Sequence, residues 1–246
     1  MTNDFFKDKH AIFIVTHRNF AAIKYFMKSL LKILNHRQDV VAAIIDSRSS
    51  DDIIDFLKTI KHDRLVIEFL PENVGKARAA NEFITNNINR DNLPKTVWSI
   101  DPDIIVGTES FDYLLEAIEN IDEKIGLLGM RFTRNNCNPE INMWLPAYRR
   151  KGKNGKIYSL KTPIMCCVAG PIFVIKGQTL ADPLQFKLFP KKFVKVYGGD
   201  DSAIWLELKK HGLKSAYLNG TKVTHLISGK KVSPELQEYI NGDNLQ

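Results

Sequence analysis

The stretch Val97-Trp98-Ser99-Ile100-Asp101-Pro102-Asp103-Ile104-Ile105-Val106 places two carboxylates between two apolar runs. The first run, at 96–100, predicts a buried strand. Pro102 fixes φ and has no backbone N–H, so the strand should stop there and leave Asp101 and Asp103 at the sheet edge. Two carboxylates so close together repel each other, and a divalent cation with hard oxygen ligands removes that repulsion. We therefore expect a metal site at the carboxyl edge of an open sheet.

Short apolar runs and helical patterns alternate on both sides of this stretch. Strand-like runs occupy 11–16, 40–45, 65–69, 96–100 and 125–130. Apolar residues at helical spacing occupy 20–34, 53–60, 77–88 and 111–118. This alternation predicts an α/β fold with a doubly wound, mostly parallel sheet.

The second half of the chain is less regular. A basic turn at 149–156 is flanked by Tyr148 and Tyr158, which predicts a hairpin. We expect further strands at 168–175, 214–218 and 222–226, and a helix that opens at 200–201. The chain is interpreted as one domain, 1–246. A first half at about 10–130 precedes a smaller mixed sheet at about 131–228, and a polar tail occupies 229–246.

Composition limits the class of protein. A chain of 246 residues with 44% hydrophobic content can fill a core, and a net charge of +7 suits an anionic ligand, a nucleic acid or an anionic membrane surface. Cys137, Cys166 and Cys167 are too few for a disulfide framework and match no zinc spacing. No signal-peptide layout and no apolar run of about 18 residues is present. We expect a cytoplasmic protein without a transmembrane segment, and peripheral membrane contact stays open.

Familiar nucleotide and hydrolase motifs are absent. There is no Gly-x-Gly-x-x-Gly after the first strand, no P-loop and no Gly-x-Ser-x-Gly elbow. Polar residues do recur at the ends of the early strands, as Thr16, Asp46, Asp101 and Asp103. Ligands bind at the carboxyl edge of open α/β sheets, so these residues outline one candidate site.

Six segments occur in an order that resembles one enzyme family. They are Ile-Val-Thr-His-Arg-Asn at 14–19, Ile-Asp-Ser-Arg-Ser-Ser-Asp at 45–51, Asn-Val-Gly-Lys-Ala-Arg-Ala-Ala-Asn at 73–81, Ile-Asp-Pro-Asp at 100–103, Ala-Gly-Pro-Ile-Phe at 169–173 and Gly-Gly-Asp-Asp at 198–201. The ordered set, over about residues 10–228, resembles the nucleotide-diphospho-sugar glycosyltransferases of GT-A fold, most of all the family 2 group. The chain departs from that group at Ser47-Arg48, where relatives usually have Asn or Asp-Gly.

The resemblance implies an enzyme, a glycosyltransferase that uses Mn²⁺ or Mg²⁺ and a nucleotide-diphospho-sugar donor. Asp103 would be the direct metal ligand. Asp101 would contact the ribose or the metal and its bound water, and His225 would be a further metal ligand. Without the resemblance, the Asp-Pro-Asp stretch also fits a simple turn, and His225 also fits an ordinary polar group at a strand end.

The resemblance also implies residues that bind the nucleotide sugar. Thr16 and Asp46 would bracket the base and ribose, and an aspartate at position 46 can accept the N3 proton of uracil. Arg18 is placed in the same site. Lys76 follows Gly75 at a helix N-terminus, a position suited to a pyrophosphate. The simpler interpretations are a strand-end cap for Asp46 and a solvated surface residue for Lys76.

On the acceptor side, Asp200 and Asp201 resemble the family's acidic pair. Asp201 would be the general base of an inverting transfer, and Asp200 would support acceptor binding. Trp144 and Gly170 are expected to contact the acceptor. The acidic pair would also be stabilised by the helix dipole without any catalytic role. The acceptor itself stays open among a glycan, a lipid-linked saccharide, a protein and a nucleic acid.

Two other functions compete with this interpretation. A sugar-phosphate nucleotidyltransferase shares the general fold, but it carries a glycine-rich loop after the first strand, where this chain has 16–19 Thr-His-Arg-Asn. A noncatalytic nucleic-acid-binding protein would use the basic clusters at 149–156, 191–192 and 230–231. The same clusters would serve a transferase whose acceptor is a nucleic acid.

Overall fold

The computed structural model describes residues 4–122, 124–132, 147–162, 171–190, 200–228 and 231–241. The strands are β1 (His10–Thr16), β2 (Val40–Asp46), β3 (Leu65–Phe69), β4 (Thr96–Ile100), β5 (Ile104–Ile105), β6 (Ile125–Phe132), β7 (Tyr148–Lys151), β8 (Ile157–Lys161), β9 (Ile172–Lys176), β10 (Lys214–His225), β11 (Ile227–Ser228) and β12 (Lys231–Val232). The helices are α1 (Phe20–His36), α2 (Asp51–Thr59), α3 (Lys76–Asn87), α4 (Thr108–Asn120), α5 (Gly177–Ala181), α6 (Asp200–Lys210) and α7 (Pro234–Asn241). None of these described helices is both long and apolar enough to cross a bilayer.

Ten strands form one sheet in the order β3-β2-β1-β4-β9-β6-β10-β8-β7, and β5 pairs with β10 beside this path. The first four strands in that order are parallel. Strand β9 is antiparallel to β4 and β6, whereas β6 and β10 are parallel. The α/β fold predicted from the alternation is confirmed, and the strands of the second half extend the sheet of the first.

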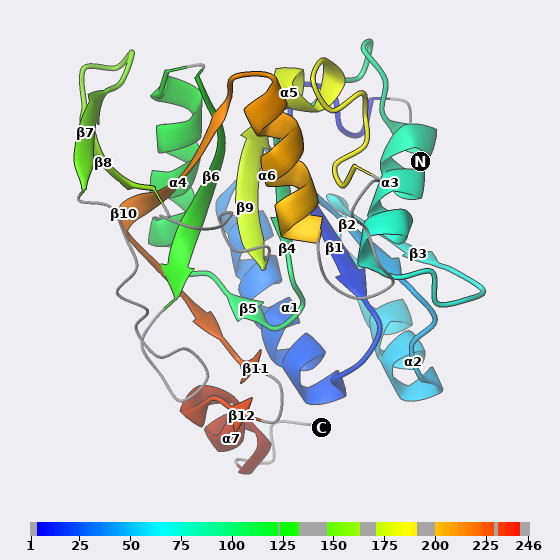
Figure 1. Ribbon diagram of the computed structural model, residues 1–246. Helices are drawn as coiled ribbons and strands as arrows, with labels where there is room; N and C mark the ends of the chain where they lie inside the picture. Colours follow the sequence, from blue (N-terminus) through cyan, green and yellow to red (C-terminus); the bar gives the residue numbers. More distant parts are fainter. Residues whose placement is uncertain are drawn as a thin grey trace.

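Helices cover both faces of this sheet (Figure 1). Alternate residues of β1 enter two different hydrophobic clusters: Ile12 and Ile14 face α1, α2 and α4, whereas Ala11 and Phe13 face α3, α5 and α6. A strand covered on both sides needs apolar residues at every position, which explains the uninterrupted apolar runs of the sequence.

Strands β2, β1 and β4 are neighbours and run in the same direction, so their carboxyl ends meet at one edge of the sheet. The register places Thr16, the last residue of β1, opposite Asp46, the last residue of β2. The Asp101-Pro102-Asp103 stretch follows β4 directly. The sheet therefore brings the polar strand ends of the sequence together, as expected.

Strand β10 differs from the expectation. The sequence predicts two short strands at 214–218 and 222–226, but the structure has one strand over Lys214–His225. Its register with β6 shifts between Tyr217 and Lys222, where Gly220 adopts a φ of 97°. A bulge of this kind bends a strand without ending it, and the polar residues that suggested a break belong to the bulge.

The predicted polar tail contains a folded segment. Helix α7 packs on α1, where the rings of Tyr239 and Tyr25 stack with their centres 4.8 Å apart. Leu236 in α7 is buried. Only a few apolar residues of this short helix face α1, which is too weak a pattern to stand out within a polar sequence.

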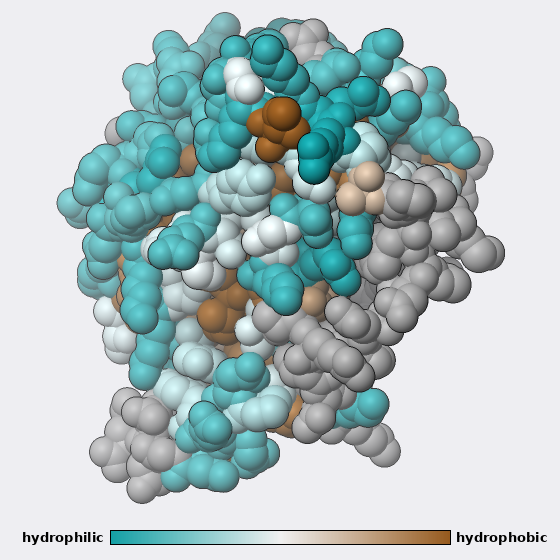
Figure 2. Space-filling model, turned by 90° about the vertical axis from the view of Figure 1, so that its left-hand side faces the viewer, coloured by the Kyte–Doolittle hydropathy of each residue, from teal (hydrophilic) through white to brown (hydrophobic). Residues whose placement is uncertain are grey.

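The hairpin predicted around the basic turn is confirmed as β7 and β8. Its turn lies against the end of α4, where the N–H of Lys153 donates to the carbonyl of Asn120 at 2.9 Å. Figure 2 views the molecule from the hairpin side, whose upper part is mostly hydrophilic. Lys156 is paired with Glu116 at 2.6 Å. The basic turn is therefore a solvated face attached to α4.

At the opposite edge of the sheet, His10 is buried at the start of β1. Its Nδ1 lies 3.0 Å from Oγ1 of Thr96, and its Nε2 lies 3.5 Å from carboxylate oxygens of both Asp39 and Glu119. Burial lowers the pKa of His10 from 6.5 to about 4, and the opposing charge of Asp39 only partly offsets this effect.

We predict that His10 makes the stability of the fold sensitive to acid. Between pH 6.5 and 4 the unfolded chain holds a proton on this residue that the folded chain does not, so the free energy of unfolding falls as the pH drops. The difference between the two pKa values corresponds to about 3 kcal/mol. Urea unfolding at pH 7 and pH 4.5 measures the free energy of unfolding of wild type and His10→Gln. The decrease between the two pH values should be smaller in the variant. Equal losses would contradict the prediction.

Candidate functional site

Asp46 ties the end of β1 to the turn that precedes α2. The hydroxyl of Thr16 donates to Oδ2 of Asp46 at 2.8 Å. The backbone N–H of Ser49 donates to Oδ1 at 2.9 Å, and the hydroxyl of Ser49 also donates to Oδ2. Asp46 is completely buried. Both carboxylate oxygens therefore already accept hydrogen bonds from the protein.

A second network joins these strand ends to the start of α3. Ser47 donates its hydroxyl to Oδ1 of Asn73 at 3.2 Å, and the same oxygen accepts the N–H of Gly75 at 3.0 Å. Nδ2 of Asn73 lies 2.9 Å from Nε2 of His17. Gly75 has a φ of 78°, a conformation that suits glycine. The network thereby fixes where Lys76 begins the helix.

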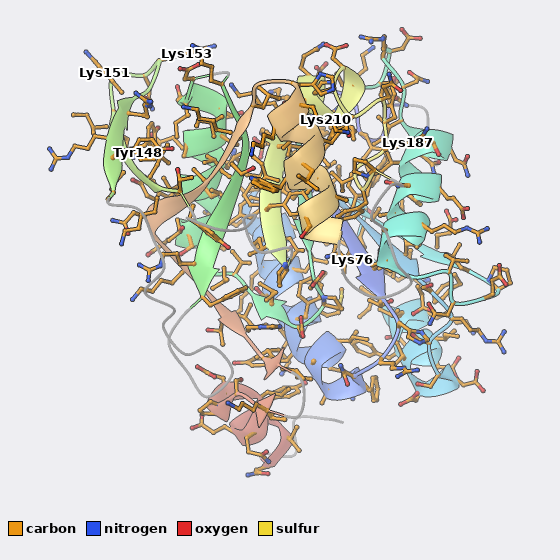
Figure 3. All side chains as sticks on the ribbon, viewed as in Figure 1. Lys76, Tyr148, Lys151, Lys153, Lys187 and Lys210 are labelled. Atoms are coloured by element: carbon orange, nitrogen blue, oxygen red, sulfur yellow. The ribbon has the colours of Figure 1, made fainter. Side chains whose placement is uncertain are left out.

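Lys76 reaches from α3 to the end of β4. Its Nζ lies 2.6 Å from Oδ1 of Asp101, and both side chains are about one quarter exposed. The ammonium group also lies 5.4 Å from the ring centre of Phe189. Phe189 is held in turn by Asn81, which donates to its carbonyl at 2.6 Å and accepts its N–H at 3.0 Å. Figure 3 shows Lys76 at the carboxyl edge of the sheet, far from Lys151 and Lys153 of the basic hairpin.

Asp103 lies beside His225, which comes from the far end of the chain. The antiparallel pairing of β5 with β10 places His225 opposite Ile104, and the N–H of Leu226 donates to the carbonyl of Asp103 at 2.8 Å. Nε2 of His225 is then 3.3 Å from Oδ2 of Asp103. The imidazole stacks on Phe132, with ring centres 5.3 Å apart.

The Asp103–His225 pair fits two ligands of one cation. Two ligand atoms at right angles around an ion with bonds of about 2.1 Å lie about 3 Å apart. The measured 3.3 Å between Oδ2 and Nε2 is close to that spacing. Asp101, the third predicted ligand, faces Lys76. Among the described residues no group of three or more such ligands forms, so this part of the chain brings two of the expected ligands together.

The acceptor residues are only partly described. Asp200 and Asp201 are the first two residues of α6, and Figure 1 shows that this end of the helix points toward the carboxyl edge of the sheet. Their side chains, and the whole of Trp144 and Gly170, lie outside the described part of the chain. The roles predicted for these four residues stay predictions.

Comparison with known proteins identifies the family. The family described as "Glycosyltransferase like family 2" matches residues 9–241. The chain belongs to this family. Its fold is that of the GT-A glycosyltransferases. A comparison with curated protein sequences gives no match.

Solved structures share the fold of this family 2 chain at low sequence identity. The mannosyltransferase PcManGT from Pyrobaculum calidifontis, in complex with GDP-Man and Mn²⁺, has a TM-score of 0.64 and 15% identity, over 91% of this chain and 59% of that chain. TarS from S. aureus, in complex with UDP-GlcNAc, has a TM-score of 0.57 and 12% identity, over 87% and 57%. GalNAc-T7 with UDP, GalNAc and Mn²⁺ has a TM-score of 0.64 and 12% identity, over 92% and 45%. The chain thus spans less than two thirds of the length of each of these structures.

An open hollow of about 490 Å³ lies beside Asp46 in this family 2 chain, between the loops that follow β1 and β2. Arg18, which the sequence places in the nucleotide-sugar site, lines it together with Arg48. Arg48 is not among the site residues predicted from the sequence. The signal was present, because Ser47-Arg48 is where the chain departs from the usual family pattern.

We predict that Asp46→Asn destabilises the fold by about 1–3 kcal/mol, because the new amide NH₂ faces a hydrogen-bond donor and leaves it unsatisfied. Thermal or urea unfolding at pH 7 measures the effect. Asp55→Asn is the matched control, since the side chain of Asp55 is 74% exposed and its pairing with Lys58 is a surface contact. If the two variants are equally stable, the hydrogen bonds of Asp46 do not hold the turn.

Proposed function

We propose that this chain transfers a sugar from a nucleotide-diphospho-sugar to an acceptor hydroxyl, with Mn²⁺ or Mg²⁺ as cofactor. The observation that carries the proposal is the meeting of two side-chain pairs, Lys76–Asp101 and Asp103–His225, at the edge where Thr16 and Asp46 also end their strands. Family membership and the nucleotide sugars named for the similar structures support it.

The donor side of the proposal follows from charge. A nucleotide sugar departs as a diphosphate, so the site needs positive charge where that group lies. Lys76 supplies an ammonium group at the N-terminus of α3, where backbone N–H groups and the helix dipole also favour an anion. Asp101 holds the ammonium in place through the 2.6 Å contact. Lys76 would therefore orient the diphosphate, and Asp101 would position Lys76 and contact the ribose.

Asp103 and His225 would hold the cation, which, when bound, stabilises the charge that develops on the departing diphosphate. The imidazole favours Mn²⁺ of the two candidates, because Mg²⁺ prefers oxygen ligands. The ring of His225 is fixed by stacking on Phe132 and by the β5–β10 pairing, so the pair is preorganised rather than dependent on a mobile side chain.

The acceptor would approach from α6. Asp201 would take the proton from the acceptor hydroxyl as it attacks the anomeric carbon, and the product would have inverted stereochemistry. Asp200 would bind the acceptor, and Trp144 and Gly170 would contribute to the same side. The orientation of α6 toward the carboxyl edge supports this assignment (Figure 1). The basic hairpin lies away from this edge (Figure 3). Its position therefore does not favour a transferase whose acceptor is a nucleic acid, nor a noncatalytic protein that binds nucleic acid through this hairpin.

Asp103→Asn tests the donor site. The loss of one charged ligand weakens binding by about 1.5–3 kcal/mol, or about 10- to 150-fold. We expect wild type to bind one class of nucleotide sugar in the presence of Mn²⁺ and the variant to bind it at least about tenfold more weakly. Calorimetry with UDP-, GDP-, ADP- and dTDP-sugars measures both. Asp91→Asn, an exposed aspartate outside the site, should bind like wild type. If no nucleotide sugar binds with Mn²⁺ or Mg²⁺, the proposed function is wrong.

Asp201→Asn tests the general base. The variant should keep metal-dependent donor binding and lose nucleotide release, because removal of a general base slows transfer by about 10²–10⁴. A coupled assay measures the release of nucleoside diphosphate from the preferred nucleotide sugar, with water as the acceptor. Calorimetry measures the binding of the same donor. Loss of donor binding together with release would assign Asp201 a structural role, and an NMR spectrum showing a retained anomeric configuration would exclude it as the base.

A further inference from the structure

The hollow between the β1 and β2 loops adjoins the nucleoside side of the proposed donor site. Its wall includes Ser49, whose backbone and hydroxyl both donate to the buried Asp46. Phe20 and Ile53 add apolar surface to the same wall. With a volume of about 490 Å³, the hollow has room for a planar base against that apolar surface.

Asp46 is poorly placed to recognise a base in this hollow. It is completely buried, and its two oxygens accept three hydrogen bonds from Thr16 and Ser49. Because the side chain of Asp46 has no exposed surface, it could accept the N3 proton of uracil only if the turn moved to uncover it. Recognition of the base therefore falls to side chains that face the hollow itself.

Three charged and exposed side chains line the hollow: Arg18, Arg48 and Asp52. Each arginine offers several N–H donors in a planar fork, and the carboxylate of Asp52 offers two acceptor oxygens. The hollow therefore presents pairs of N–H donors from the arginines together with a pair of acceptor oxygens from Asp52. A base that matches it must carry two adjacent acceptors on one edge and two adjacent donors on another.

Guanine is the common base with that pattern. Its O6 and N7 are adjacent acceptors that suit an arginine fork, and its N1–H and N2 amino group are adjacent donors that suit a carboxylate. Uracil alternates acceptor, donor and acceptor. Cytosine and adenine present a single amino group as their donor.

We infer that the donor of this enzyme is a guanine nucleotide sugar, with Arg18 and Arg48 on the O6/N7 edge and Asp52 on the N1/N2 edge. This inference rests on the proposed function and names the nucleotide that the same site takes.

The backbone of Arg48 supports its assignment. Its φ of 57° is left-handed, which is uncommon for a residue with a side chain, and such outliers cluster at functional sites. One guanidinium N–H donates to the carbonyl of Pro71 at 3.1 Å, and this bond fixes the position of the fork. An arginine has five N–H donors, so this single bond leaves enough of them to contact a base.

The test is calorimetry of GDP, IDP, UDP, CDP and ADP with Mn²⁺, on wild type, Arg48→Gln and Asp52→Asn. A good bidentate contact discriminates bases by about 5- to 150-fold, so GDP should bind at least about fivefold more tightly than UDP, CDP and ADP. Arg48→Gln should weaken the binding of GDP by a similar factor and leave the affinity for UDP nearly unchanged. IDP lacks the N2 amino group, so the preference for GDP over IDP should disappear in Asp52→Asn.

Arg90→Gln is the matched control, because Arg90 is an exposed arginine paired with Asp182 outside the hollow. It should bind every nucleotide like wild type. Tightest binding of UDP, CDP or ADP would overturn the guanine assignment and leave the proposed transferase intact. An equal loss for all nucleotides in Arg48→Gln would also overturn it, as would GDP binding that is unaffected by Asp103→Asn. If no nucleoside diphosphate binds, the proposed function and this inference fail together.

Discussion

The hydrogen bond from Thr16 to the buried carboxylate of Asp46 is the contact on which the rest of the site depends. It joins the carboxyl ends of β1 and β2, which the parallel register already places side by side. From Asp46 the bonding continues to Ser49 and so sets the turn before α2. The neighbouring Ser47 bonds to Asn73 and so sets the start of α3. The turn before α2 and the loop before α3 are thus both positioned by one sheet edge. As a result, Lys76 at the start of α3 lies beside Asp101.

The two carboxylates of the Asp-Pro-Asp stretch turn out to have different partners. The sequence suggests that they share one cation, because two carboxylates so close together repel each other. In the structure Asp101 faces the ammonium of Lys76 on α3, and Asp103 faces the imidazole of His225 on β10. The ammonium of Lys76 therefore offsets the charge of Asp101, and the two carboxylates face different side chains. The stretch connects a side that would hold the diphosphate to a side that would hold the cation, and the separation follows from the elements that flank it.

The sequence predicts most of the first half of the fold because β1, β2 and β4 are covered on both faces and their apolar runs are unbroken. The same runs show where the strands end, so Thr16, Asp46, Asp101 and Asp103 could be assigned to one edge. The contact between Asp103 and His225 could not be derived in this way, because it requires the antiparallel pairing of β5 with the end of β10. Nor does residue type show that Asp46 already has all its oxygens engaged. That fact depends on the conformation of the turn.

The turn after β2 combines three buried residues and one exposed arginine within four residues. Asp46, Ser47 and Ser49 are buried and bond to protein groups, whereas Arg48 between them is exposed and lines the hollow. The left-handed φ of Arg48 is what allows this alternation, because it turns one side chain outward while both of its neighbours stay in the network. Residue 48 can therefore change without disturbing the bonds that hold the strand ends, while residues 46, 47 and 49 cannot. In this chain an arginine occupies that position, and the guanine assignment would place its guanidinium group against the base.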